Sequence, residues 1–176
     1  MGTIYTIGHS TRRVEEFTGT LRAHSIQAVI DIRAFPGSRR FPHFNRQSLE
    51  NVLRAEGFEY RWLEALGGRR PRTLEVSPNP ALRNASFRNY ADHMLTPEFK
   101  KAAGDLIEIA GQWRAAIMCA ERLYFRCHRM LVSDWLLAHG HEVLHIDDAR
   151  PPAAHKLLPE AQIVNGQLLY RGNLLI

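Results

Sequence analysis

Short apolar runs alternate along this chain with segments in which apolar residues recur every three or four positions. The runs have the length of buried β-strands, and the spacing between them is that of helices with one apolar face. The predicted strands are residues 4–7, 26–32, 58–62, 115–119 and 142–146. The predicted helices contain residues 14–21, 49–53, 97–112 and the run from Cys127 to Leu136. Ser10 or Thr11 is the expected N-cap of the first helix.

Two segments depart from this alternation. Residues 66–86 lose all periodicity and contain three prolines, which predicts a long surface excursion. Near the end of the chain, residues 161–164 and 167–170 flank the dipeptide Asn165-Gly166. Asn-Gly between two β-prone segments is a strong signal for a two-residue hairpin turn.

The order of these elements predicts an α/β fold. Strands that alternate with helices form parallel sheets through right-handed crossovers. We therefore expect an open, mostly parallel, Rossmann-like sheet of about five strands, with helices on both faces. Residues 1–176 would form a single domain, and residues 161–170 a C-terminal hairpin appended within it.

The composition does not change the predicted fold, but it narrows the classes of partner that the protein could bind. The chain has 176 residues, of which 45% are hydrophobic and 23% charged, and no apolar stretch approaches the ~20 residues of a membrane span. The N-terminus lacks the features of a signal peptide, and the two cysteines do not suggest a secreted disulfide framework, so we expect a cytoplasmic protein. The net charge of +5 rests on arginine rather than lysine, which favours an anionic ligand or partner without naming one.

Polar residues gather where the predicted strands end, and the carboxyl ends of parallel strands are where open α/β sheets bind ligands. The candidate catalytic residues are His9, Cys119, Glu121 and His128. The candidate ligand-binding residues are Ser10, Asp31, Arg33, Ser38, Arg39, Cys127 and Arg129. The amides that open the helix after Cys127 would add an anion-binding helix end. We expect a pocket for a small anionic, phosphate-bearing ligand, and the pattern leaves open whether it is catalytic.

The two cysteines leave two interpretations open. A nucleophilic Cys119 is one hypothesis, although a free cysteine that ends an apolar strand also fits a plain core role. Either thiol becomes reactive if the helix start and Arg129 lower its pKa. The spacing from Cys119 to Arg126 does not match the Cys-x5-Arg loop of tyrosine-type phosphatases, which excludes that class.

Two other classes remain open at this point. In residues 33–46 four arginines interleave with three phenylalanines, which suits phosphate contacts and base stacking by a nucleic-acid-binding protein. The basic residues of segment 69–72 would extend that surface. A metalloprotein with a Cys/His site is the third class, but no Cys-x2-Cys pair supports it, and we assign no metal ligand. The pattern names no cofactor, and it does not indicate the oligomeric state.

Five separated motifs, taken together, resemble a known family. They are Thr6-Ile7-Gly8-His9-Ser10, Asp31-Ile32-Arg33-x-x-Pro36-x-Ser38-Arg39, Leu66-Gly67-Gly68, Cys119-Ala120-Glu121 and Cys127-His128-Arg129. In this order they are similar to the bacterial and archaeal "domain of unknown function 488" family, over roughly residues 3–147. The resemblance implies a compact α/β protein and strengthens the polar cluster as a site, but it leaves the reaction open.

Overall fold

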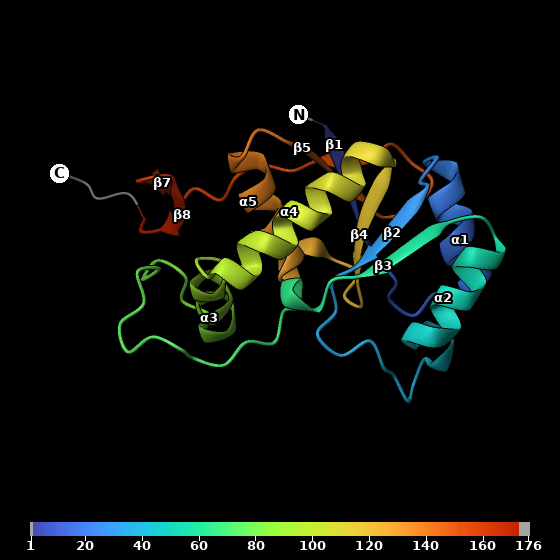
Figure 1. Cartoon of the computed structure of the whole chain (residues 1–176), viewed down its shortest axis with the longest axis horizontal. Coiled ribbons are helices and arrows are strands. Elements are labelled where there is room, and N and C mark those ends of the chain that lie inside the picture. The colour runs from blue at the N-terminus through green and yellow to red at the C-terminus, as the bar shows by residue number, and fades with distance from the viewer. Residues whose placement is uncertain (1, 173–176) are drawn as a thin grey trace.

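A six-stranded sheet forms the centre of the protein (Figure 1), in a computed structural model that describes residues 2–172. The strand order is β3-β2-β4-β1-β5-β6. The first five strands of this order are parallel, and β6 runs antiparallel to β5 at the edge. The strands are β1 (Thr3–Gly8), β2 (Ala28–Asp31), β3 (Glu59–Trp62), β4 (Ala115–Cys119), β5 (Glu142–Ile146) and β6 (Ala153–Ala154).

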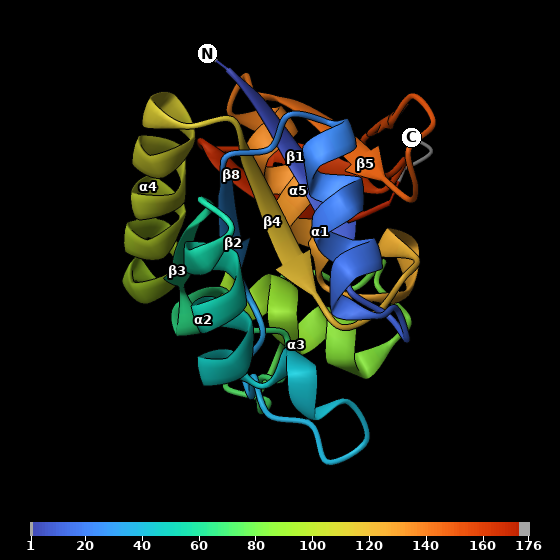
Figure 2. The same ribbon diagram turned by 90° about the vertical axis from the view of Figure 1, so that its right-hand side faces the viewer.

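Helices cover both faces of this sheet, as Figures 1 and 2 show. α1 (Val14–Ala23) and α2 (Arg46–Ala55) lie on one face, and α3 (Ala85–His93), α4 (Pro97–Gln112) and α5 (Arg129–Ala138) lie on the other. The strands β1, β2, β4 and β5 contribute alternate side chains to the two cores, because successive residues of a strand point to opposite faces. In β4, Ile117 and Cys119 pack on the α3–α5 side, whereas Met118 packs on the α1–α2 side.

The α/β fold with helices on both faces is therefore confirmed, and β4 and β5 have the predicted bounds. α4 also spans the predicted residues: Pro97 occupies its first turn, and the Thr96 hydroxyl accepts a hydrogen bond from the Phe99 amide. The predicted cap of α1 is wrong. Ser10 adopts a left-handed backbone conformation with φ of 54°. The N-cap of α1 is Arg13, and its side chain makes no capping hydrogen bond.

The periodicity did not reveal α3 or β6. α3 follows the proline-containing excursion and begins at Asn84, whose side chain accepts hydrogen bonds from the Ser86 and Phe87 amides. β6 has only two residues, too few to leave a pattern. α3 packs beside the start of α5, so this helix forms one wall of the region described below.

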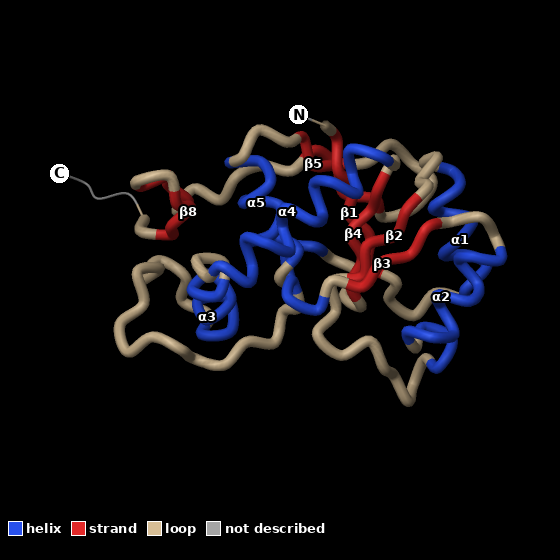
Figure 3. The backbone as a smooth tube through the Cα atoms, viewed as in Figure 1, coloured by secondary structure: helices blue, strands red, loops and turns tan. Residues whose placement is uncertain are grey.

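The C-terminal hairpin is confirmed with its predicted bounds. β7 (Ala161–Val164) and β8 (Gln167–Tyr170) form a separate two-stranded sheet, which Figure 3 shows apart from the central strands. Asn165 and Gly166 both have positive φ, of 50° and 75°, as a tight hairpin turn requires. Leu168 and Tyr170 are buried, and they attach the hairpin to the core on the α3–α5 side.

Candidate functional site

The carboxyl ends of β1, β2 and β4 meet at one edge of the sheet. Gly8 lies opposite Cys119, and Asp31 lies opposite Met118. After these strands, the chain continues toward α1 on one face and toward α5 on the other. Such a divergence of neighbouring strands opens a crevice in α/β sheets.

Two cysteine sulfurs meet in this crevice. Cys119 ends β4, and Cys127 lies two residues before α5; their Sγ atoms are 3.0 Å apart and unbonded. The Arg129 Nε lies 3.1 Å from the Cys119 Sγ and 3.3 Å from the Cys127 Sγ. The Arg129 backbone N–H also donates to the Cys127 Sγ, over 3.3 Å. One guanidinium thus donates hydrogen bonds to both sulfurs.

Arg129 is held rigidly in this position. Its side chain is only 1% exposed, and its remaining N–H groups donate to the Thr6 hydroxyl and to the backbone oxygens of Glu121 and Arg122. A buried guanidinium needs a negative partner, since an isolated charge in a protein interior is costly. Within the part of the chain that the structure describes, no carboxylate bonds to Arg129, so an ionised cysteine supplies that charge.

The environments of the two thiols push their pKa values apart. Burial raises the pKa of the Cys119 thiol well above its usual range, and its hydrogen bond to Cys127 adds to the rise. Burial also acts to raise the pKa of Cys127, but hydrogen bonds from Cys119 and His128 and the charge of Arg129 outweigh it and lower that pKa to about 3. The pair therefore holds one proton: Cys127 is the thiolate and Cys119 is the thiol that donates to it.

Two glycines allow the neighbouring loop to approach this pair. A Cβ on Gly68 would lie 2.6 Å from the His128 Cγ, and a Cβ on Gly67 would lie 2.6 Å from the Ala34 Cα. The His128 Nε2 in turn donates to the Ile32 carbonyl oxygen, over 2.9 Å. His128 is thus fixed between β2 and the Gly67-Gly68 segment, where it orients the residue before α5.

Asp31 and Arg33 form a second polar unit beneath the crevice. The fully buried Asp31 carboxylate accepts from the Arg33 guanidinium and backbone N–H and from the Tyr60 hydroxyl. Arg33 also donates to the Phe44 carbonyl oxygen and, over 3.3 Å, to the His9 Nε2. The His9 Nδ1–H then donates to the Ser10 oxygen, so both ring nitrogens are occupied. Burial, together with the Arg33 charge, lowers the pKa of His9 to about 4.

A cavity of about 500 Å³ opens beside the Cys127 sulfur. Apolar side chains line part of it, and its charged groups are Arg33, Arg69, Glu121 and Arg126. Arg69, Glu121 and Arg126 are exposed and make no side-chain hydrogen bond or ion pair within residues 2–172. The lining residues are Arg33, Ala34, Phe35, Gly37, Gly68, Arg69, Ser86, Phe87, Cys119, Ala120, Glu121, Arg126, Cys127 and His128.

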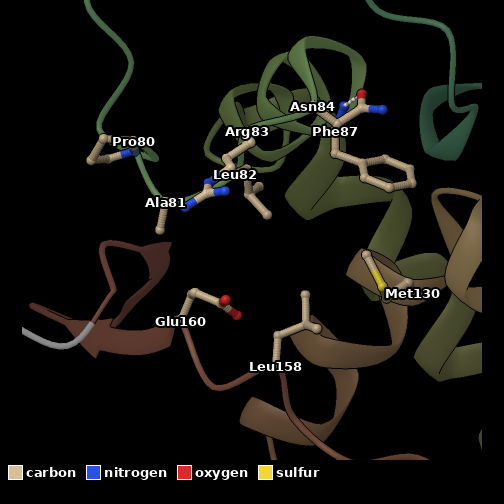
Figure 4. Close-up of a pocket in the computed structure, with 9 residues that line it drawn as sticks. All are labelled: Pro80, Ala81, Leu82, Arg83, Asn84, Phe87, Met130, Leu158 and Glu160. Carbon is tan, nitrogen blue, oxygen red and sulfur yellow. Dashed lines mark hydrogen bonds between the residues drawn. The ribbon is translucent and has the colours of Figure 1, made fainter.

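Phe87 separates this cavity from another of about 600 Å³, which lies between residues 80–84 and the C-terminal segment. Figure 4 shows Leu158 and Glu160 on one side of this cavity, across from Ala81 and Arg83. This second cavity contains no thiol or histidine, so the chemistry concentrates around Cys127.

The structure brings most of the predicted site residues together, some at the wall of the cavity and others buried behind it. Arg33, Cys119, Glu121, Cys127 and His128 line the cavity, and His9, Asp31 and Arg129 lie buried behind it. Ser10, Ser38 and Arg39 do not line it. Ser10 borders a different depression, the Ser38 hydroxyl accepts from the Phe41 amide within its own loop, and Arg39 is exposed.

The sequence did not single out Arg126 or Phe87 as site residues, and it indicated Arg69 only as part of the basic segment 69–72. Arg126 directly precedes Cys127, and Arg69 directly follows Gly68, so adjacency to the recognised motifs was the available signal. Phe87 left no such signal, because it lies on α3, which the periodicity does not predict.

The side chains of the loop of residues 33–46 are divided between the interior and the surface. Phe44 is buried and stacks on His9, with ring centroids 4.1 Å apart, and the Arg33 guanidinium is bonded to Asp31. Phe35, Arg39, Arg40 and Arg46 are exposed. Within residues 2–172, no group of three or more His, Cys, Asp or Glu side chains is arranged to hold a metal ion. No helix of the described residues combines the length and apolarity needed to cross a bilayer.

The fold and the site together define a class: an α/β domain with a guanidinium-bound cysteine pair at the carboxyl edge of its sheet. The family model "Domain of unknown function DUF488" matches residues 13–136, and the chain belongs to this family. The match includes both cysteines, Asp31 and Arg33, but it begins after His9 and ends before β5. No curated protein and no solved structure matches the chain.

Proposed function

We propose that this protein is an enzyme in which the Cys127 thiolate attacks a small anionic substrate bound in the adjacent cavity. One observation carries the proposal. The Cys127 sulfur accepts hydrogen bonds from the Nε and the backbone N–H of a buried arginine while it borders a 500 Å³ cavity. Reactive cysteines have this combination of lowered pKa, positive surroundings and access to ligand.

The charged side chains around the cavity favour a substrate with an anionic group. Arg69 and Arg126 are exposed at its wall, and guanidinium groups bind carboxylate or phosphate through paired N–H donors. Arg33 contributes less, because Asp31 neutralises it. Phe35 and Phe87 offer apolar contacts to the rest of the ligand. An anionic group would therefore bind between the two arginines, with the reacting atom near Cys127.

Glu121 is the candidate proton donor and acceptor for this reaction. It lines the cavity, and its side chain has no hydrogen-bond partner within the described residues. His128 is a weaker candidate, since its Nε2–H is bonded to the Ile32 oxygen. His9 has both ring nitrogens occupied and does not line the cavity, so we assign it a structural role.

Alkylation kinetics test this proposal. Iodoacetate and iodoacetamide carry the same leaving group, but only iodoacetate is anionic, so their rate ratio reports the charge of the site. We expect Cys127→Ser to abolish the fast alkylation. Arg69→Ala and Arg126→Ala should each slow iodoacetate about threefold to fivefold, the effect of a solvent-exposed charge, and leave iodoacetamide unchanged. Arg13→Ala, an exposed arginine that opens α1 and does not line the cavity, is the matched control.

Either of two results would contradict the proposal. Fast alkylation that persists in Cys127→Ser would show that another group is the nucleophile. Equal rate ratios in Arg69→Ala, Arg126→Ala and Arg13→Ala would show that the cavity has no preference for anions.

A further inference from the structure

The proposed nucleophile leaves the second sulfur without a role. Cys119 is 3% exposed and lies behind Cys127, with the two Sγ atoms 3.0 Å apart. A disulfide requires an S–S distance of about 2.05 Å, so an approach of about 1 Å would bond them. Both cysteines border the cavity, but their sulfurs differ in access, since Cys127 is the more exposed of the two.

We propose that Cys119 and Cys127 form a two-electron redox pair that reduces small anionic disulfides. This inference rests on the proposed function, because it uses the same Cys127 nucleophile and the same cavity. It adds the resolving role of Cys119 and names the substrate class.

The first step forms a mixed disulfide. The Cys127 thiolate attacks one sulfur of the substrate R–S–S–R, a Cys127–S–R bond forms, the substrate S–S bond breaks, and one thiolate RS⁻ leaves. In the second step the Cys119 thiol gives its proton to that RS⁻, and its sulfur attacks the Cys127 Sγ. The Cys119–Cys127 bond forms and the Cys127–S–R bond breaks. The second RS⁻ leaves, so the substrate gains the two electrons that the protein loses. An external thiol restores the dithiol by the reverse exchange.

Arg129 explains how the second thiol becomes reactive. Its Nε lies within hydrogen-bond distance of both sulfurs, 3.1 Å from Cys119 and 3.3 Å from Cys127. Once Cys127 carries the substrate sulfur it is neutral, and Cys119 becomes the only sulfur near the buried guanidinium that can ionise. The positive charge then stabilises the Cys119 thiolate, as it stabilised the Cys127 thiolate before. The arrangement thus supports nucleophilic attack by each sulfur in turn.

The cavity favours anionic disulfides over others of the same chemistry. The wall carries Arg69 and Arg126 against a single carboxylate, that of Glu121. Three probe disulfides separate charge from reactivity: glutathione disulfide is anionic, 2-hydroxyethyl disulfide is uncharged, and cystamine is cationic. We expect glutathione disulfide to react at least threefold faster than 2-hydroxyethyl disulfide, cystamine to react slowest, and the order to disappear in an Arg69→Ala/Arg126→Ala variant.

The test is intact-mass analysis of the reduced protein after reaction with glutathione disulfide and quenching with N-ethylmaleimide. The wild-type chain should lose two hydrogens, release two molecules of glutathione, and yield a Cys119–Cys127 disulfide on peptide mapping. Cys119→Ser should stop at the glutathione adduct of Cys127, and Cys127→Ser should form neither product. Cys119→Ala is a second variant in case the serine hydroxyl destabilises the core, and the wild-type measurement needs no variant.

The outcomes separate this inference from the proposed function. A wild-type chain that stops at the glutathione adduct, as Cys119→Ser does, would overturn the redox pair and leave Cys127 as the nucleophile. A wild-type chain that forms no adduct with any of the three disulfides, yet is alkylated rapidly at Cys127, would overturn the substrate class. If Cys127 resists both the disulfides and alkylation, the proposed function fails with it.

Discussion

At the scale of single residues, the charge of Arg129 determines which sulfur is ionised. Both thiols contact it, yet only Cys127 also receives the Arg129 backbone N–H, and Cys119 is the more deeply buried. Desolvation therefore keeps the proton on Cys119, whereas hydrogen bonds from Cys119 and His128, with the charge of Arg129, keep the negative charge on Cys127. The nearby Asp31–Arg33 pair follows the same principle, because burial there is tolerated only where each charge has a bonded partner.

The first residue-scale prediction concerns the pH dependence of Cys127. With a folded-state pKa of about 3, Cys127 is a thiolate at every pH above 5. We expect the rate of its alkylation by iodoacetamide to stay constant between pH 5 and pH 8. The urea-unfolded chain is the control, and its rate should rise about tenfold per pH unit until it approaches the ordinary thiol pKa of about 8.5. A folded-state rate that rises with pH as the unfolded one does would show that Cys127 is an ordinary thiol.

The second residue-scale prediction concerns Asp31. Replacing it with asparagine removes the carboxylate that the buried Arg33 guanidinium needs. We expect Asp31→Asn to lower the free energy of unfolding by about 3–5 kcal/mol, measured by urea denaturation. Glu50→Gln is the control, because it breaks the partly exposed Glu50–Arg54 pair and should cost less than about 1 kcal/mol. A similar cost for both variants would mean that the Asp31–Arg33 pair adds nothing beyond a surface contact.

At the scale of elements, glycines set how closely loops approach the sheet edge. Gly8 packs against the Glu121 carbonyl, Gly67 against Ala34, and Gly68 against the His128 ring. A side chain at any of these positions would occupy space that backbone or ring atoms already fill. The start of α5, and with it Cys127, is therefore positioned from outside the helix by the segment that carries Gly67 and Gly68.

The element-scale prediction tests this contact. Gly68→Ala should displace His128, weaken its hydrogen bond to the Ile32 oxygen, and lower both the stability and the alkylation rate of Cys127. Overpacking of this kind costs about 1–3 kcal/mol. Gly104→Ala in α4 is the matched control: no atom lies within 4 Å of its new Cβ, and the helix should gain about 0.5–1 kcal/mol. Thermal unfolding and iodoacetamide kinetics report the two effects, and equal behaviour of the two variants would exclude the contact.

At the scale of the whole molecule, a buried chain of hydrogen bonds joins the site to the C-terminal hairpin. Thr6, which accepts from Arg129, bonds to the His145 Nδ1; the His145 Nε2 bonds to the His155 Nδ1, and the His155 Nε2 bonds to Asp134. The Tyr170 hydroxyl of β8 donates to the same Asp134 carboxylate. The C-terminal segment, although outside the family match, is thus linked through His145 to Thr6, a hydrogen-bond partner of Arg129.

This network and His9 predict how stability depends on pH. Burial lowers the pKa of His9 to about 4 and that of His145 to about 3, with the charges of His155 and Arg129 also lowering the latter. Both histidines remain neutral in the fold at pH values where the unfolded chain, with an ordinary pKa of 6.5, binds protons. The unfolded state therefore binds more protons below pH 6.5, and each histidine should lower the stability by about 1.4 kcal/mol per pH unit down to pH 4.

Urea denaturation between pH 4 and pH 7 measures this slope. We expect His145→Gln to reduce it, whereas His139→Gln, which replaces an exposed histidine after α5, should leave it unchanged. The slope is the readout, so an overall loss of stability in either variant does not obscure the comparison. A slope that is identical in wild type and His145→Gln would show that His145 titrates equally in the folded and unfolded chains.

The sequence by itself determined the elements whose pattern is local. The apolar runs of β4 and β5, the Thr96-Pro97 start of α4 and the Asn165-Gly166 turn each depend on neighbouring residues, and the structure has them where they were predicted. The same reasoning placed the polar cluster at the strand ends, because parallel strands that alternate with helices must end at one edge. α3 escaped prediction, since its Asn84 cap follows a proline-rich stretch with no periodicity.

Only the tertiary structure decided what each polar residue does. Spacing along the chain could not reveal that His9 and Asp31 are hydrogen-bonded to Arg33, that the Ser38 hydroxyl bonds within its own loop, or that Phe87 lines the same cavity as Cys127. Nor could it distinguish Cys127 from Cys119, because the difference arises from depth of burial and from the hydrogen bonds that each sulfur receives. Burial and hydrogen bonding depend on residues distant in sequence, so a local pattern can gather such groups but cannot assign their charges or their access to ligand.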